Sequence, residues 1–275
     1  SGAQTREDRV SEVPNDSSER RGVLGLLWGV VARPRSTMEA VAKSGRRTWW
    51  LPALLILSLT TAYVVASGPI RTRETREEMR AAQEEMAEQM GQQLSEEDLE
   101  RAQSITASPL ITVVFPAVSG VAGRVAGWLI WAAALYLASI ALGGRSNFGQ
   151  VFPVTVWAGF PYALRGLIQT IYVLVSGQLI ANPGLSGLVQ QSRSAADLIA
   201  SPPSTGRTLL SAFLSRVDLF LVWHLVLLVI AVTAATRLSR RKSTLVTIAV
   251  WVLLTGLSLI PALIGGFFAP SRPGM

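Results

Sequence analysis

The 275-residue sequence contains no cysteine and a single histidine, His224. Without cysteine, the chain forms no disulfide and offers no thiol nucleophile or cysteine-ligated cluster. A zinc site needs three or four protein ligands, so one histidine alone predicts no metal site and excludes a zinc protease. Lysine is nearly as scarce: Lys43 and Lys242 are the two lysines, and neither lies in a GxxxxGK[ST] loop. Nucleotide hydrolysis at such a loop is therefore excluded, and we predict no catalytic residue and no cofactor.

Charge is also scarce. Charged residues make up 16% of the chain and hydrophobic residues 49%, whereas soluble domains carry about 25% charged residues. The charges gather in residues 1–47, 71–101 and 237–242, and the stretches between them are nearly free of charge. This segregation is typical of a chain with lipid-facing segments. The net charge of +7 is explained by basic residues beside membrane spans, and no basic-aromatic module predicts nucleic-acid binding.

Five apolar segments are long enough to cross about 30 Å of hydrocarbon as helices. The run over 109–142 is too long for one span, because its 34 residues would make a helix of about 51 Å. We therefore divide it into an interfacial lead-in over 110–116 and a span. The predicted spans are residues 48–67, 117–142, 151–176, 217–236 and 243–268. The expected fold is all-α, an integral membrane five-helix bundle within a domain covering residues 48–268.

The basic segments predict the orientation of the bundle. Residues 1–47 carry nine lysines and arginines, residues 237–242 (RLSRRK) carry four, and the loop after the second span carries Arg145. With five spans these segments lie on one side, and short basic segments are cytoplasmic. We expect a plasma (inner) membrane protein with a cytoplasmic N-terminus and an extracytoplasmic C-terminus. The connections 68–108 and 177–216 and the tail 269–275 then face outward.

The segment before the first span predicts two short helices. Residues 1–21 are polar and are expected to form a disordered tail, whereas residues 22–47 show apolar residues at helical spacing with Pro34 between the two helices. These helices either lie on the cytoplasmic leaflet as an amphipathic pair or pack under the bundle. Three tryptophans are the expected anchors at the membrane surface: Trp28, Trp49 and Trp50.

The two outer connections differ in composition. Residues 68–108 are strongly helix-forming, and Met79, Met86 and Met90 recur at positions i, i+7 and i+11. Such a stripe predicts either an adaptable face for a partner or a helical hairpin that packs on itself or on a twin. Residues 177–216 are rich in Ser, Gly and Pro, which predicts a flexible loop.

A few polar residues lie within the predicted spans, where each is costly. By depth, Asp218 can meet either Arg124 or Arg165, and such a pair would fix how the helices assemble. The alternative is an ion or proton relay through Arg165, Asp218 and His224. A lone histidine in a helix more often forms a hydrogen bond in the core.

Two further features concern the helices themselves. Pro161 lies inside the third span and should kink it or split it into two half-helices. Gly123 and Gly127 form one small-xxx-small step on the second span. Such a step permits close helix approach and a possible homodimer.

Three segments stand out together: ARPRSTMEAVAKS with Pro34, FGQVFPVTVWAGFPYALRGLI with Phe148, Pro153 and Pro161, and VDLFLVWHLVLLVIAV with Asp218, Phe220 and Trp223. They resemble the Yip domain family, the membrane proteins named for interaction with Ypt/Rab GTPases. The resemblance covers about residues 25–266. It implies five spans, a cytoplasmic N-terminus and a non-enzymatic role, and some bacterial members work beside ABC-type exporters. The long acidic loop over 68–108 resembles bacterial members, so the vesicle-traffic role is not carried over.

The resemblance and the missing chemistry together predict a non-enzymatic accessory or scaffold protein. Its expected partners are the lipid bilayer and another membrane complex such as an ABC-type exporter. The alternative is a small transporter or channel, with a polar path at a broken helix near Pro161, Arg165, Asp218 and His224.

Overall fold

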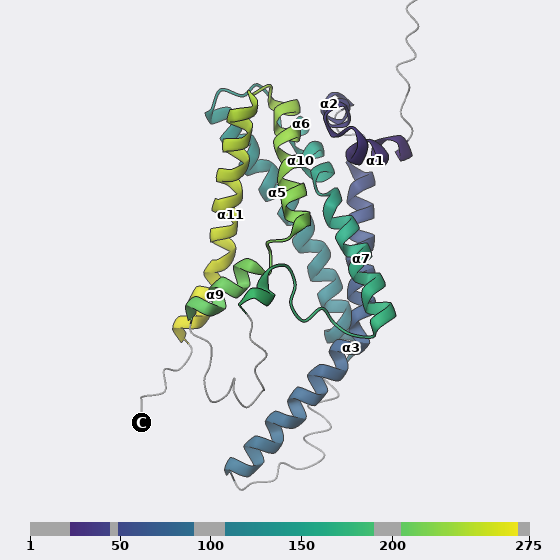
Figure 1. Cartoon of the computed structure of the whole chain (residues 1–275), viewed down its shortest axis with the longest axis vertical. Helices are drawn as coiled ribbons and strands as arrows, with labels where there is room; N and C mark the ends of the chain where they lie inside the picture. Colours follow the sequence, from purple (N-terminus) through teal and green to yellow (C-terminus); the bar gives the residue numbers. More distant parts are fainter. Residues whose placement is uncertain (1–22, 45–48, 91–107, 190–204, 269–275) are drawn as a thin grey trace, which may run out of the picture.

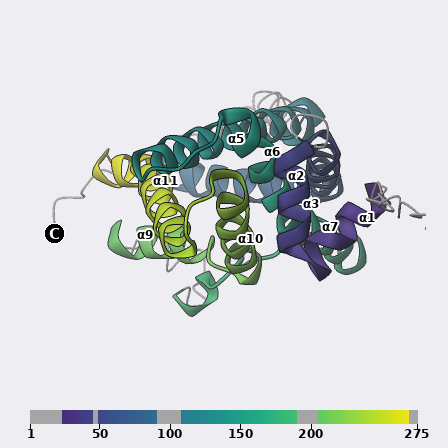
Figure 2. The ribbon, with the colours of Figure 1, turned by 90° about the horizontal axis from the view of Figure 1, so that it is seen from above.

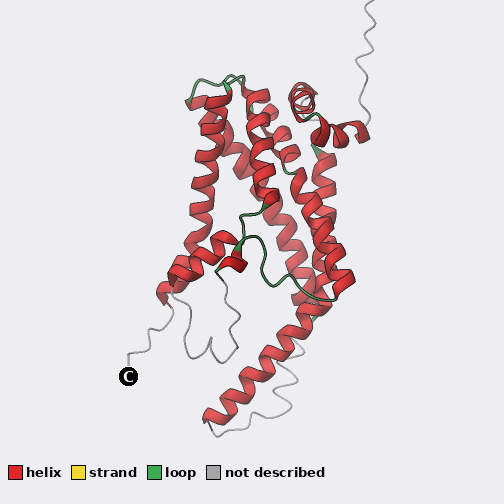
Figure 3. Ribbon diagram, viewed as in Figure 1, coloured by secondary structure: helices red, strands yellow, loops and turns green. Residues whose placement is uncertain are grey.

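The computed structural model describes residues 23–44, 49–90, 108–189 and 205–268, and the regular elements within these ranges are all helices (Figure 3). Five helical segments of this described part are long and apolar enough to cross a membrane. This confirms the predicted all-α membrane bundle with five spans. The candidate spans are Trp50–Glu77, Leu110–Ala141, Phe148–Ser176, Leu219–Thr236 and Arg240–Pro261.

The first span continues into the polar segment that follows it. Helix α3 (Trp50–Met90) has 41 residues with Pro69 inside, whereas the sequence predicted a span ending at residue 67. Proline removes one backbone hydrogen bond, but the Arg-, Glu-, Ala- and Met-rich sequence after it favours helix strongly. Gly68 lets the neighbouring chain approach at this point, since a Cβ there would lie 2.5 Å from Cγ2 of Val113. In Figure 1, the polar half of α3 projects well beyond the rest of the bundle.

The second span has no separate lead-in. The π-helix η2 (Leu110–Val114) runs directly into α5 (Phe115–Ala141), whereas the sequence predicted a division at residue 116. Pro116 lies in the first turn of α5, directly after the wider π-helical turn in which the N–H of Phe115 donates to the carbonyl of Leu110, and the chain stays helical through it. The span ends where Gly143 takes a φ of 84°, a conformation that glycine adopts readily.

The third span consists of two helices in line. Helix α6 (Phe148–Ala158) begins with a capping box between Asn147 and Gln150, and α7 (Phe160–Ser176) follows after Gly159. Pro161 lies in the first turn of α7. Because proline has no N–H, it cannot bond to the carbonyl of Trp157 four residues earlier, and the helix divides at this point.

Helix α10 (Leu219–Thr236) packs against α2, α6, α7 and α11. It connects to α11 (Arg240–Phe268) through Arg237, which ends α10 in the left-handed conformation at φ 58°. The main core lies between α10 and its neighbours. Its fully buried members include Leu135 and Trp157, together with Leu228 of α10 itself.

The N-terminal helices α1 (Val23–Ala32) and α2 (Pro34–Ser44) lie beside one end of the bundle (Figure 2). Met38 and Val41 of α2 are fully buried in the main core. One face of α2 therefore packs against the bundle. Trp28 of α1 is 72% exposed and points away from that core.

The connection between α7 and α10, which the sequence predicted to be a flexible loop over 177–216, is partly helical. The helix α9 (Thr205–Leu214) packs against α11 and against the short helix η3 (Ser186–Leu188). The N–H of Leu185 donates to the carbonyl of Leu214 at 2.9 Å, so distant residues of the connection fold onto each other. Residues 190–204 lie outside the described residues.

The turns between the long helices lie at two opposite ends of the molecule. At one end lie α1, α2 and the turns α5–α6 and α10–α11, with Arg145 and Arg237 on these turns; we call it the basic end (Figure 1). At the other, the far end, lie η3, α9 and the projecting half of α3.

Candidate functional site

An ion pair joins two spans towards the far end. Nη1 of Arg165 on α7 lies 3.1 Å from Oδ2 of Asp218, and the two side chains are 24% and 15% exposed. Asp218 also caps α10, because its Oδ1 accepts a hydrogen bond of 2.8 Å from the N–H of Leu221. A carboxylate is favoured at a helix N-terminus by the helix dipole. Both carboxylate oxygens are therefore engaged, one with α7 and one with α10.

Arg124 has a different partner. Its guanidinium on α5 lies over the ring of Tyr162, 5.5 Å from the ring centroid, in the arrangement of a cation–π contact. The sequence left open whether Asp218 pairs with Arg124 or Arg165, and the structure places Arg165 in the ion pair. Because the helix breaks at Pro161 and α7 begins at Phe160, Tyr162 lies in the first turn of α7.

His224 of α10 is buried and lies 2.7 Å, through Nδ1, from the carbonyl oxygen of Ala158. The break between α6 and α7 leaves this carbonyl available, because the N–H of Tyr162 bonds to Gly159 instead. The imidazole ring also packs against Tyr162, with centroids 4.8 Å apart, and against Trp131 at 5.8 Å. His224 thus ties α10 to the broken helix.

These contacts form two neighbouring sets, the Arg165–Asp218 ion pair and the contacts of Tyr162 with Arg124 and His224. We call them together the polar cluster, which links α5, α6, α7 and α10. Tyr162 sits at its centre, between Arg124 and His224. Sequence reasoning missed Tyr162. The available signal was its place next to Pro161 and three residues before Arg165, on the same helical face. The members of the polar cluster are Arg124, Tyr162, Arg165, Asp218 and His224.

A cavity of about 480 Å³ adjoins the polar cluster. Arg124, Tyr162 and Arg165 line it, together with Arg216, which donates a hydrogen bond to Oγ of Ser258. Sequence reasoning also missed Arg216, because it lies just before a span and gains its place only when α9 packs on α11. Of the four residues that the sequence placed on a polar path, Arg165 lines this cavity, whereas Pro161, Asp218 and His224 do not.

The other residues singled out by sequence lie apart from the polar cluster. Nothing lies within 4 Å of a Cβ built on Gly123 or Gly127, so this step is not a contact between helices of the chain. Trp49 packs edge-on against Phe152, with centroids 5.4 Å apart, whereas Trp50 is 49% exposed. Met79, Met86 and Met90 belong to α3, and their side chains lie outside the described residues.

The described residues contain no group of three His, Asp or Glu side chains close enough to hold a metal ion. The intramembrane charges instead engage each other, an aromatic ring or a neighbouring hydroxyl. Such a bundle defines the chain as a multi-pass helical membrane protein whose spans are joined by polar contacts.

The comparisons identify the family. The model of the Yip1 domain matches residues 28–268, nearly the whole chain, and the chain belongs to the Yip1 domain family. This confirms the resemblance seen in the sequence, and the family is known as one of non-enzymatic membrane proteins. Neither the comparison with curated proteins nor that with solved structures gave a significant match.

Proposed function

We propose that the chain is a non-enzymatic accessory or scaffold protein of the plasma (inner) membrane that assists another membrane complex, such as an ABC-type exporter. One observation carries the proposal: Asp218 uses both carboxylate oxygens to hold α7 against α10. A carboxylate engaged in this way fixes helix assembly. Membership of the Yip1 domain family supports the same reading.

Helix α5 offers the surface that a membrane partner would use. The most apolar 18-residue stretch of Leu110–Ala141 contains no buried residue. Gly120, Gly123 and Gly127 open onto space free of other atoms within 4 Å of a Cβ. In a bilayer, small residues on the surface of a helix let the backbone of a second helix approach closely. A homodimer would use the same surface.

The two ends of the molecule would serve different compartments. Short basic segments favour the cytoplasmic side, so we place the basic end, with α1 and α2, in the cytoplasm. The far end and the C-terminus then lie outside. The projecting half of α3 would carry Met79, Met86 and Met90 towards a partner on that side.

The test is purification of the full chain from its native membrane in mild detergent, followed by mass spectrometry of the associated proteins. We expect a membrane complex in fixed stoichiometry that is lost when residues 78–104 are deleted or in the double variant G123L/G127L. The deletion leaves the candidate span Trp50–Glu77 intact.

The matched control is G256L. Gly256 on α11 also has no atom within 4 Å of its Cβ, but it lies on another helix. Recovery of the chain alone, or equal recovery of the same complex from all variants, would contradict the accessory role.

A second candidate function is a small transporter or channel. The cavity of about 480 Å³ beside a broken helix, lined by Arg124, Arg165 and Arg216, favours it. Anion flux into liposomes tests this function. A transporter would lose flux in R216Q at unchanged melting temperature, whereas a scaffold gives no flux above that of empty liposomes.

A further inference from the structure

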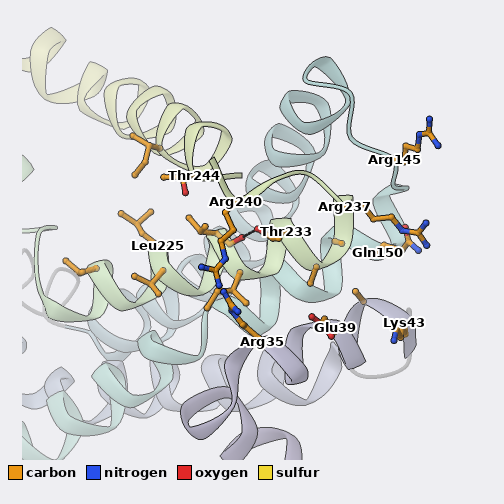
Figure 4. A pocket seen from close by; sticks show the side chains of 18 residues that line it. Arg35, Glu39, Lys43, Arg145, Gln150, Leu225, Thr233, Arg237, Arg240 and Thr244 are labelled. Atoms are coloured by element: carbon orange, nitrogen blue, oxygen red, sulfur yellow. Dashed lines mark hydrogen bonds between the residues drawn. The ribbon is translucent and has the colours of Figure 1, made fainter. Parts of the chain in front are cut away.

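A larger cavity, of about 1050 Å³, lies at the basic end between α2, α10 and α11 (Figure 4). We call it the basic groove. Helix α2 closes one side of it with Arg35 and Glu39, and the start of α11 closes another with Arg240. The groove exists because α2 is packed against α10 through the buried Met38 and Val41.

Positive charge dominates the mouth of the basic groove. Five cations line it against one carboxylate, Glu39, and within the described residues the ion pair found is Arg165–Asp218, at the opposite end. Figure 4 shows Arg35 and Arg240 reaching towards each other from facing helices. Two guanidinium groups directed into one space repel each other unless an anion lies between them. The five cations are Arg35, Lys43, Arg145, Arg237 and Arg240.

The wall behind the cations is apolar and follows one face of α10. The lining residues Val222, Leu225, Val226, Val229 and Ile230 recur at helical spacing, and Val222 and Val226 are 54% and 52% exposed. From Val222 to Arg237 the helix rises about 22 Å. The groove is therefore charged at one end and apolar along most of its length.

This distribution matches an amphiphile with an anionic head. We propose that the basic groove binds one anionic phospholipid. Its phosphate lies between Arg35 and Arg240, and an acyl chain lies along the Val222–Ile230 face of α10. Basic pockets between membrane helices are suited to acidic headgroups, and guanidinium groups bind phosphate oxygens in pairs. Because α2 forms one wall, the bound lipid would also fasten α2 to the bundle. The proposal does not depend on the accessory role.

The test measures lipid bound to the full chain by native mass spectrometry in detergent, during titration with phosphatidylglycerol or with phosphatidylcholine of the same acyl chains. We expect phosphatidylglycerol to bind at least about tenfold more tightly. The double variant R35Q/R240Q should lose about 30-fold in affinity for phosphatidylglycerol. The matched control R241Q removes a charge from the same helix but outside the groove, and should change the affinity by less than about threefold.

Two further variants separate the charged mouth from the apolar wall. V226W fills the groove and should abolish lipid binding with all the arginines present, whereas V252W adds the same bulk to an exposed position of α11 outside the groove. R35K/R240K keeps the charges and should retain most of the affinity, which separates loss of charge from loss of folding in R35Q/R240Q.

Several results would overturn the proposal. Equal affinity for the two lipids would do so, as would equal losses in R35Q/R240Q and R241Q, or unchanged binding in V226W. Glycerophosphoglycerol is phosphatidylglycerol without its acyl chains. If it displaces phosphatidylglycerol as well as the intact lipid does, the groove is a site for a free phosphate and not for a lipid.

Discussion

At its N-terminus α10 presents Asp218 to Arg165 at 3.1 Å, whereas at its C-terminus it leads into Arg237 and Arg240, which no carboxylate of the described residues neutralises. Both ends hold several arginines beside a cavity. At the far end the protein supplies the partners itself, and the arginines contribute to assembly. At the basic end no ion pair forms among the described residues, and the arginines are suited to an external anion. The partners of an arginine, and not its burial alone, decide its role.

The largest effect is expected from removal of Asp218. D218A should lower the free energy of unfolding in detergent by about 3 kcal/mol, since it leaves Arg165 without its partner and α10 without its cap. D218N keeps a capping side chain and should lose about 2 kcal/mol. Denaturant titration of the purified variants checks both values. Unchanged stability of D218N would mean that the ion pair contributes nothing.

Replacement of His224 tests how the broken helix is held at the middle of α10. H224F keeps a ring between Tyr162 and Trp131 but leaves the carbonyl of Ala158 without a donor, so we expect a loss of about 1–2 kcal/mol. H224Q restores a side-chain donor and should recover part of it. The same unfolding titration measures both variants. Equal stability of H224F and the parent chain would mean that the hydrogen bond between His224 and Ala158 does not stabilise the fold.

Arg124 should contribute less than Asp218, because it rests on a ring and not on a charge. R124Q is expected to cost about 1 kcal/mol, whereas Y162F keeps the ring face and should stay within about 0.5 kcal/mol. Thermal unfolding of the two variants measures the difference. If Y162F costs as much as R124Q, the hydroxyl of Tyr162 and not its ring is the important group.

The smallest effect belongs to the basic end. In detergent without anionic lipid, R35Q or R240Q should raise the stability by less than about 0.5 kcal/mol, since each removes repulsion between like charges. The gain should disappear at high salt, which screens that repulsion. A loss of more than about 1 kcal/mol in either variant would show that the arginine already has a partner within the protein.

Much of the fold could be predicted from the sequence. Long apolar runs must be helical in a bilayer because every backbone polar group has to be satisfied within the segment. The apolar runs placed all five spans within a few residues, except at the end of the first span and the start of the second. The polar half of α3 and the lead-in at 110–116 both continue a span directly. The end of the charge-free run suggested the boundary at residue 67, and Pro116 suggested the one at residue 116. The helix continues through both positions, with Pro69 and Pro116 inside it.

Sequence reasoning named four of the five residues of the polar cluster and left their pairing open. The scarcity of charge in the spans singled out Arg124, Arg165, Asp218 and His224, because a charge in a membrane span needs a partner. Sequence spacing could not decide between the two arginines, since both lie at a suitable depth. Tyr162 was missed because an aromatic residue in an apolar span gives no signal of its own.

By itself the sequence determined that this chain crosses a membrane five times as helices, which of its ends is basic, and which family it belongs to. Each of these follows from local composition and residue order. Only the tertiary structure decided that Arg165 and not Arg124 meets Asp218, that His224 holds the carbonyl of Ala158, and that α2 closes a basic groove against α10. The physical reason is that each of these contacts joins residues from different helices, and their distance depends on how the helices pack and rotate against each other.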